Sequence, residues 1–302
     1  TFGFLGPNGA GKTSTMRMIG CISPVSGGTL EVLGMDPADH GSEIRRRLGV
    51  VPQEDTLDRE LTVMENLLIY GRYFDLPYAE CRRRARELLE FVQLTEKVDS
   101  QVEPLSGGMK RRLTIARSLM NEPEMILLDE PTTGLDPRSR LSMWGIIRGL
   151  VKEGTTLLLT TQYLEEADEL ADSIAVVNHG KIIAEGTARE LKRQVGGERI
   201  EVHLHRSEDI PFVEGVLARY GEGDIAVEAT TRHLSVAAGG GSEKLFGVFR
   251  ELDEAGIAVD DIGMRRPTLD DVFLSLTGHV AEEDEALETT LIGAEEAQEA
   301  ER

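Results

Sequence analysis

Eight residues near the start of the chain combine three glycines with a lysine and a threonine, in the order GPNGAGKT from position 6 to position 13. The glycines let the backbone curl so that successive N–H groups point toward one centre. Together with the Lys12 ammonium and the Thr13 hydroxyl, these N–H groups can bind phosphate oxygens, and the hydroxyl can also hold Mg²⁺. We therefore predict a phosphate-binding loop made of Gly6, Pro7, Asn8, Gly9, Ala10, Gly11, Lys12, Thr13 and Ser14.

Two acidic residues follow an apolar strand predicted at Met125–Leu128. The strand carries Asp129 and Glu130 to its carboxyl end, where ligands bind in open α/β sheets. Asp129 is then placed to hold Mg²⁺, and Glu130 to polarise an attacking water molecule. A solvated acidic pair after a strand is the alternative, and the phosphate-binding loop makes that alternative weaker.

A second anion site is predicted at Leu105-Ser106-Gly107-Gly108-Met109. Ser106 has the side chain of a helix N-cap, and the two glycines after it leave the first N–H groups of the helix approachable. An ordinary capped helix is the alternative, and Ser106 caps the helix in either case.

With this third motif the chain resembles the ATPases of ABC transporters, because the segment 105–109 is similar to their signature motif. The resemblance implies that ATP and Mg²⁺ are bound, and that Ser106, Gly107 and Gly108 close over ATP held by a second copy of the chain. It also implies a Mg²⁺ set of Thr13, Gln53 and Asp129. Gln53 matches the glutamine that senses Mg²⁺ and contacts the membrane subunit, with an exposed loop residue as the alternative. Asp136 matches a residue of the dimer interface and is also a helix N-cap before a proline.

One position departs from the family pattern, because Gln162 stands where ABC ATPases usually have a histidine that contacts the γ-phosphate. Glutamine can donate an N–H but carries no charge and relays no proton. The same departure, together with the segment 267–278, resembles the daunorubicin/doxorubicin-resistance ATP-binding proteins. The catalytic residues implied by the resemblance are Lys12, Glu130 and Gln162.

These residues must be positioned by an α/β domain, since strands alternate with helices from residue 1 to about residue 195. We predict a P-loop nucleotide-binding domain over 1–195 with a helical subdomain at about 59–111. The strands are expected at Thr1–Leu5, Thr29–Leu33, Leu48–Pro52, Met125–Leu128, Thr155–Thr161, Ser173–Asn178 and Lys181–Glu185. ABC ATPases usually begin with further strands that carry an aromatic residue for adenine, and we expect these upstream of Thr1.

The pattern changes after Val195-Gly196-Gly197, and residues 196–280 read strand, helix, strand, strand, helix, strand. This is the order of a ferredoxin-like domain, for which we expect an accessory role. His203 and His205 share one face of its first strand, either as part of a partly exposed face or as metal ligands. Residues 281–302 carry nine acidic residues and one arginine, so we expect a disordered acidic tail.

Composition limits the partners and the compartment. The formal net charge of −21 argues against a nucleic-acid partner, because phosphate backbones bind a positive face. Two cysteines, Cys21 and Cys81, form no disulfide framework and indicate a reducing compartment. No apolar run reaches the roughly 20 residues of a membrane-spanning helix. We therefore expect a peripheral protein at the cytoplasmic face of the membrane.

The sequence favours an ATPase subunit that exports a drug-like or lipophilic compound through a separate multi-span permease of the ABC-2 type. A homodimer is expected because the essential motifs other than the histidine are intact in this copy. A soluble ABC ATPase of translation or DNA repair, and a nucleotide-gated regulator without catalysis, are the alternatives. Intact Glu130 argues against the regulator, and Gln162 argues weakly for it.

Overall fold

The computed structural model describes residues 1–194, 198–239, 242–265, 267–273 and 276. The chain divides into two compact units, one from Thr1 to Ala188 and a second that begins at Arg189. Each unit contains its own sheet. Residues 195–197, after which the sequence pattern changes, and the predicted acidic tail lie outside the described residues.

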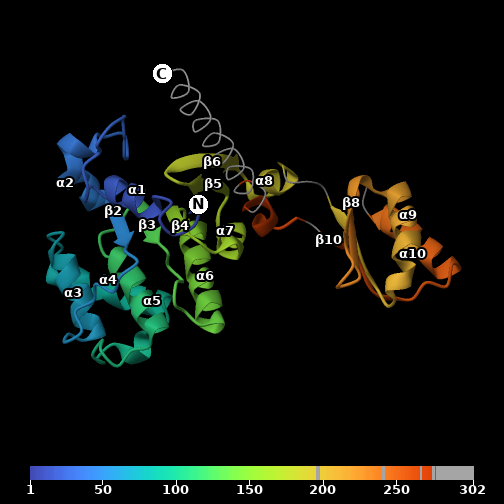
Figure 1. The fold of residues 1–302 in the computed structure, drawn as a ribbon. Helices are drawn as coiled ribbons and strands as arrows, with labels where there is room; N and C mark the ends of the chain where they lie inside the picture. The colour runs from blue at the N-terminus through green and yellow to red at the C-terminus, as the bar shows by residue number, and fades with distance from the viewer. Residues whose placement is uncertain (195–197, 240–241, 266, 274–275, 277–302) are drawn as a thin grey trace, which may run out of the picture. The chain divides into compact units, whose positions relative to one another are not determined.

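The first unit is built on a six-stranded sheet (Figure 1). Its strands lie in the order β2 (Leu48–Val51), β3 (Met125–Asp129), β4 (Thr156–Thr161), β1 (Phe2–Leu5), β5 (Ser173–Asn178) and β6 (Lys181–Gly186). Neighbouring strands from β2 to β5 are parallel, and β6 pairs with β5 antiparallel. The predicted parallel sheet with a terminal hairpin is therefore confirmed. Parallel pairing brings the carboxyl ends of β1, β3 and β4 to one edge.

Alternating residues of β3 pack against helices on opposite faces of this sheet. Ile126 and Leu128 join the core that contains residues of α3 (Val63–Arg72), α4 (Tyr78–Phe91), α5 (Gly107–Ser118) and α6 (Pro137–Lys152). Leu127 faces the other way, toward Met16 of α1 (Lys12–Ile19) and Ile44 of α2 (Pro37–Arg47). Burial on both faces explains why the strand reads as a continuous apolar run. The short helices η1 (Thr95–Lys97) and α7 (Leu164–Leu170) complete the unit.

The strand predicted at Thr29–Leu33 is wrong. The segment forms only an isolated bridge between Val32 and Met35, next to left-handed backbone at Leu33 (φ 53°) and Gly34 (φ 76°). Backbone of this kind makes a tight turn and cannot continue a ladder. The next element is α2, which the sequence analysis did not predict. Its signal was Asp36, which accepts a hydrogen bond from the Ala38 amide at 2.8 Å, before a proline in the first helical turn.

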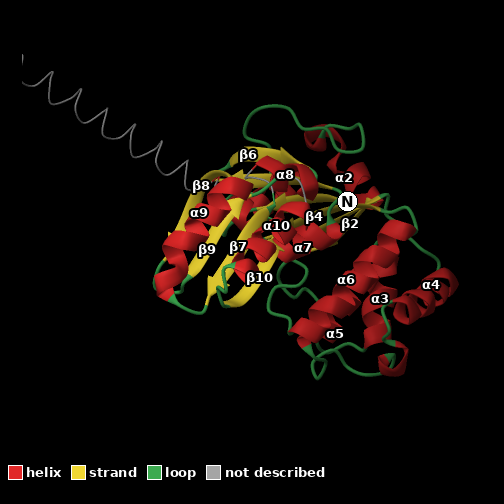
Figure 2. Cartoon of the chain, turned by 90° about the vertical axis from the view of Figure 1, so that its right-hand side faces the viewer, coloured by secondary structure: helices red, strands yellow, loops and turns green. Residues whose placement is uncertain are grey.

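The second unit has the predicted βαββαβ order. Its antiparallel sheet runs β10 (Val259–Arg265), β7 (Arg199–Leu204), β9 (His233–Ala237) and β8 (Glu222–Glu228). Helices α9 (Ile210–Tyr220) and α10 (Ser242–Glu254) cover one face, and their buried residues share a core with alternate residues of β7 (Figure 2). Helical structure is also described at α8 (Ala188–Gln194), at η2 (Ser207–Asp209) and, after β10, at residues 269–273.

His203 of β7 and His205, which lies just beyond the end of that strand, have partners that explain them without a metal ion. His203 stacks on His233 with ring centroids 4.3 Å apart, and Nδ1 of His205 lies 2.8 Å from Asp260. In the part of the chain that the structure describes, no group of three or more His, Cys, Asp or Glu side chains is placed to hold a metal ion. After β10, Thr268 and Asp271 exchange hydrogen bonds and so form a capping box at the start of the helical residues 269–273.

Candidate functional site

The glycine-rich loop connects the end of β1 to the first turn of α1. A side chain at Gly6 would come within 2.2 Å of the carbonyl oxygen of Val177 on β5, so only glycine fits there. Gly11 has φ 100°, which glycine adopts without strain, and it directly precedes the first residue of the helix. The loop therefore presents its amides and the N-terminus of α1, and these groups favour an anion.

Lys12 is 4% exposed, and its ammonium lies inside the loop. Nζ donates to the carbonyl oxygens of Gly6 at 2.7 Å and Pro7 at 3.0 Å, and it lies 3.5 Å from Oε1 of Glu130. The ammonium is thus already located between the loop and the acidic pair. A phosphate group bound by the loop would lie beside this cation.

Asp129 and Thr13 come together from segments 116 residues apart, as predicted. The Thr13 hydroxyl donates to Oδ1 of Asp129 at 3.3 Å, and the Thr160 hydroxyl donates to the same oxygen. Hydroxyl, carboxylate and amide oxygens are hard ligands that suit Mg²⁺, which is usually held by one or two carboxylates together with substrate phosphates. The residues present therefore fit the expected ion.

Glu130 is almost fully buried and is held by three side chains. Besides Lys12, Nε2 of Gln53 donates to its Oε2 at 3.0 Å, and the Thr133 hydroxyl donates to the same oxygen at 3.1 Å. Gln53, which was predicted as a third Mg²⁺ ligand, thus has its amide nitrogen on Glu130. The Glu130 backbone has φ 46°, a left-handed conformation that a non-glycine residue adopts at a cost of about 1 kcal/mol or more.

Ser106 and Asp136 cap neighbouring helices. Ser106 accepts a hydrogen bond from the Met109 amide at 3.3 Å, and Asp136 accepts one from the Ser139 amide at 3.0 Å. The hydrogen bonds from Ser139 lower the pKa of Asp136. A polar hollow of about 270 Å³ lies at this point, lined by Gln93, Ser106, Gly108, Met109, Arg112, Arg138, Ser139 and Ser142. No residue from 6 to 14 lines the hollow, so the signature motif and the loop form separate parts of the unit.

Comparison with known proteins decides the family. The chain is 47% identical to the daunorubicin resistance ATP-binding protein DrrA2 of Streptomyces coeruleorubidus, over 95% of this chain and 89% of that protein. It is 44% identical to the Nod factor export ATP-binding protein I of Ralstonia nicotianae, over 92% of this chain and 85% of that protein. This chain belongs to the ATP-binding proteins of ABC transporters.

Two family models and two solved structures agree with this membership. The ABC transporter model matches residues 1–133, and the model of the DrrA1-3-like C-terminal domain matches residues 186–277. The dimeric ATP-binding cassette MJ0796, in a post-hydrolysis state with ADP and Pi, is 28% identical with a TM-score of 0.56, over 62% of this chain and 84% of that one. An ATP-binding subunit of an ABC transporter gives a TM-score of 0.57 at 30% identity, over 64% and 80%. The chain is an ATPase.

Helices long and apolar enough to cross a bilayer are absent from the described residues of this ABC protein.

We propose separate tasks for the residues around the loop. Lys12 is placed to neutralise charge on the transferred phosphate, and Glu130, one residue beyond Asp129, is placed to accept a proton from the attacking water. Bound Mg²⁺ would supply further charge neutralisation on the phosphate oxygens. The hydrogen bonds from Gln53 and Thr133 restrict the Glu130 carboxylate to one orientation.

Three residues near this site were missed by the sequence analysis. Thr160 donates to Asp129, and its carbonyl and hydroxyl oxygens accept from the Glu130 amide at 3.0 and 3.1 Å. Glu166 is fully buried, which raises its pKa, and it accepts a hydrogen bond from Trp144 at 3.0 Å. Arg111 donates to five backbone carbonyls around Glu130. The sequence signal for Arg111 was its position on the helix that carries the signature motif.

Gln162 follows β4 at the same edge of the sheet. Its side chain is partly buried and makes no hydrogen bond to the residues that the structure describes. The turn that contains it is closed by Thr161, whose hydroxyl accepts from the Tyr163 amide at 2.9 Å. The amide side chain is therefore available to a ligand.

We expect Gln162→Ala to slow ATP turnover by roughly tenfold, since a hydrogen bond to a charged group contributes about 1.5–3 kcal/mol. Gln162→His should retain activity and gain a change in rate near pH 6.5, because imidazole titrates there and glutamine does not. The measurement is ATPase rate against pH for the wild type and both variants. An alanine variant with the wild-type rate would show that Gln162 makes no contact with the phosphate.

Proposed function

We propose that this ABC ATPase powers the export of a drug-like or lipophilic compound through a separate multi-span permease of the ABC-2 type. The chain would act as a homodimer at the cytoplasmic face of the membrane. The observation that carries the proposal is the buried constellation of Lys12, Asp129 and Glu130 in a chain whose relatives are a daunorubicin resistance protein and a Nod factor export protein.

Separation of the two anion sites supports the dimer. Ser106 and Gly107 are exposed at the start of α5, beside a hollow that contains no residue of the phosphate-binding loop. Arg112 and Arg138 make this hollow electropositive, as a site for phosphate requires. The loop of a second copy would bring ATP to it, and an isologous dimer would complete two such sites.

An apolar groove supports a membrane partner. A hollow of about 390 Å³ is lined by Gly20, Ile22, Ser42, Arg45, Arg46, Leu48, Val50, Tyr70, Tyr73 and Phe74. Ile22 and Tyr73 are 59% and 76% exposed there, and exposed apolar side chains that gather around one hollow are typical of a surface that binds a partner. Leu48 and Val50 belong to β2, the strand that leads to Gln53, so a segment bound in the groove would lie close to the nucleotide site.

We expect Tyr73→Glu to reduce the fraction of the chain that sediments with the membranes of its native host by about tenfold or more, since a central aromatic residue often contributes 2 kcal/mol to an interface. Tyr78→Glu is the matched control, because Tyr78 is also exposed (57%) and does not line the groove. Wild-type protein that neither sediments with these membranes nor co-purifies with a multi-span protein would refute the proposed export function.

A further inference from the structure

Arg111 connects the helix of the signature motif to the nucleotide site. It lies on α5, which Ser106 caps. Nε donates to the carbonyl of Pro131 at 2.9 Å, and Nη2 donates to the carbonyls of Asp129 at 2.7 Å and Glu130 at 3.1 Å. Nη1 donates to the carbonyls of Pro52 and, at 3.4 Å, Gln53. A guanidinium has five N–H donors, so its full hydrogen-bonding capacity is used on backbone of two segments distant in sequence.

Removing the Arg111 guanidinium from water costs free energy of hydration. Burial lowers the pKa of Arg111 to about 10, against the attraction of nearby carboxylates, of which Asp129 has the largest effect. A charge taken out of water is retained in a fold when its hydrogen bonds compensate for the lost hydration. Five carbonyl acceptors provide that compensation.

The carbonyls that Arg111 binds include those of Gln53 and Glu130, the two residues whose side chains meet at the proposed general base. Glu130 has a left-handed backbone (φ 46°), which persists only where surrounding structure holds it. Gln53, whose side chain binds the Glu130 carboxylate, has its own carbonyl on the same guanidinium. A shift of α5 would therefore move the backbone of Glu130 and the donor on its carboxylate together.

We propose that Arg111 is a positioning residue for hydrolysis, which makes the location of the Glu130 carboxylate depend on the location of α5. The inference rests on the proposed role of Glu130 and on the shared site. In a dimer, Ser106 at the start of α5 would contact ATP on the partner, so each chain would sense the partner's ATP through Arg111. This would couple the two sites.

Arg111→Lys tests the proposal, because lysine keeps the charge and offers three donors at a single point instead of a planar fork. We expect kcat for ATP to fall by about tenfold or more with KM within about twofold, since the carboxylate is misplaced while the phosphate-binding loop is untouched. Arg111→Gln, a neutral residue with two donors, serves as a second variant and should show the same split between kcat and KM.

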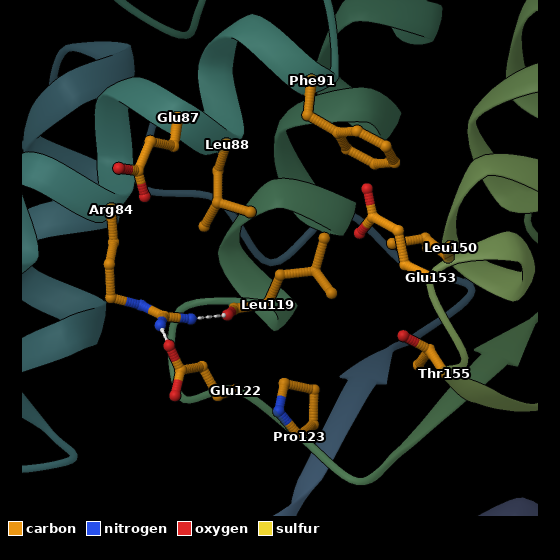
Figure 3. A pocket seen from close by; sticks show the side chains of 10 residues that line it. All are labelled: Arg84, Glu87, Leu88, Phe91, Leu119, Glu122, Pro123, Leu150, Glu153 and Thr155. Carbon is orange, nitrogen blue, oxygen red and sulfur yellow. Dashed lines mark hydrogen bonds and ion pairs between the residues drawn. The ribbon is translucent and has the colours of Figure 1, made fainter.

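Arg84→Lys is the matched control. Arg84 is a largely buried arginine of the same subdomain, and its Nε and Nη2 donate to the carbonyls of Met120 at 2.9 Å and Leu119 at 2.7 Å. It also pairs with Glu122 at the edge of a hollow of about 370 Å³ that no residue of the nucleotide site lines (Figure 3). Arg84→Lys should lower Tm at least as much as Arg111→Lys does, and it should leave kcat within about twofold of the wild type.

Two results would overturn the positioning role: an unchanged kcat in both Arg111 variants, or an equal fall in kcat in Arg84→Lys. Glu130→Gln is assayed in parallel with these variants. If Glu130→Gln is inactive while the Arg111 variants turn over normally, only the inference about Arg111 fails. If Glu130→Gln turns over at the wild-type rate, the proposed role of Glu130 fails, and the route through Arg111 fails with it.

Discussion

Replacing Lys12 with alanine is expected to lower kcat for ATP hydrolysis by a factor of at least about one hundred. The ammonium is buried within the phosphate-binding loop, 2.7–3.5 Å from two loop carbonyls and Glu130, and is therefore fixed before the reaction. Preorganised charge of this kind contributes about 2.7–4 kcal/mol to the transition state. The substitution also leaves the buried Glu130 carboxylate without its cation, so Tm should fall.

Lys152→Ala is the control for this experiment, because Lys152 is an exposed lysine at the end of α6. It should hydrolyse ATP at the wild-type rate. Both proteins are compared by kcat at saturating ATP and by Tm. A folded Lys12→Ala protein that retains more than about half of the wild-type kcat would contradict the assignment of the phosphate to this loop.

Glu130→Gln is expected to separate binding from hydrolysis. The amide has nearly the shape of the carboxylate but cannot accept the proton of the attacking water, so turnover should fall by about 10²- to 10⁴-fold. ATP affinity should be retained or increase, because the substitution removes a negative charge 3.5 Å from Lys12. ATP that is bound and not hydrolysed should then hold two chains together.

The measurements are ATPase rate, affinity for ATP and molecular mass with and without ATP. Glu153→Gln, an exposed glutamate at the end of α6, makes the same chemical change away from the site and should behave as the wild type. Wild-type turnover by Glu130→Gln would exclude Glu130 as the general base, and loss of ATP affinity would mean that the carboxylate is needed for binding.

Residues whose local conformation depends on their neighbours in the chain were predicted well. The loop at 6–14 and the acidic pair at 129–130 each occur next to an apolar strand, and parallel pairing of β1, β3 and β4 brings them to one edge. Ser106 and Asp136 carry their own helix-capping signals, and both caps are observed. The chemistry and the local conformation of these residues depend on a few neighbours in the chain.

Features that depend on distant backbone were not predicted. Arg111 is one of several arginines on the helices of its subdomain, and only the fold shows that its acceptors lie near residues 52 and 130. Gln53 was predicted to bind Mg²⁺. In the structure its amide donates to Glu130, which is 77 residues away in the chain. The false strand at 29–33 arose because Val32 is buried by the core around α1 and α2 without pairing to a sheet.

A mixing experiment tests most directly whether ATP is hydrolysed between two chains. Lys12→Ala removes the loop's cation and leaves Ser106 intact, and Ser106→Arg blocks the signature motif and leaves Lys12 intact. Each variant alone should be inactive. In an equal mixture, about half of the dimers should be mixed, each with one complete site, so about a quarter of the wild-type rate should return. A mixture as inactive as its two components would contradict a site shared between chains.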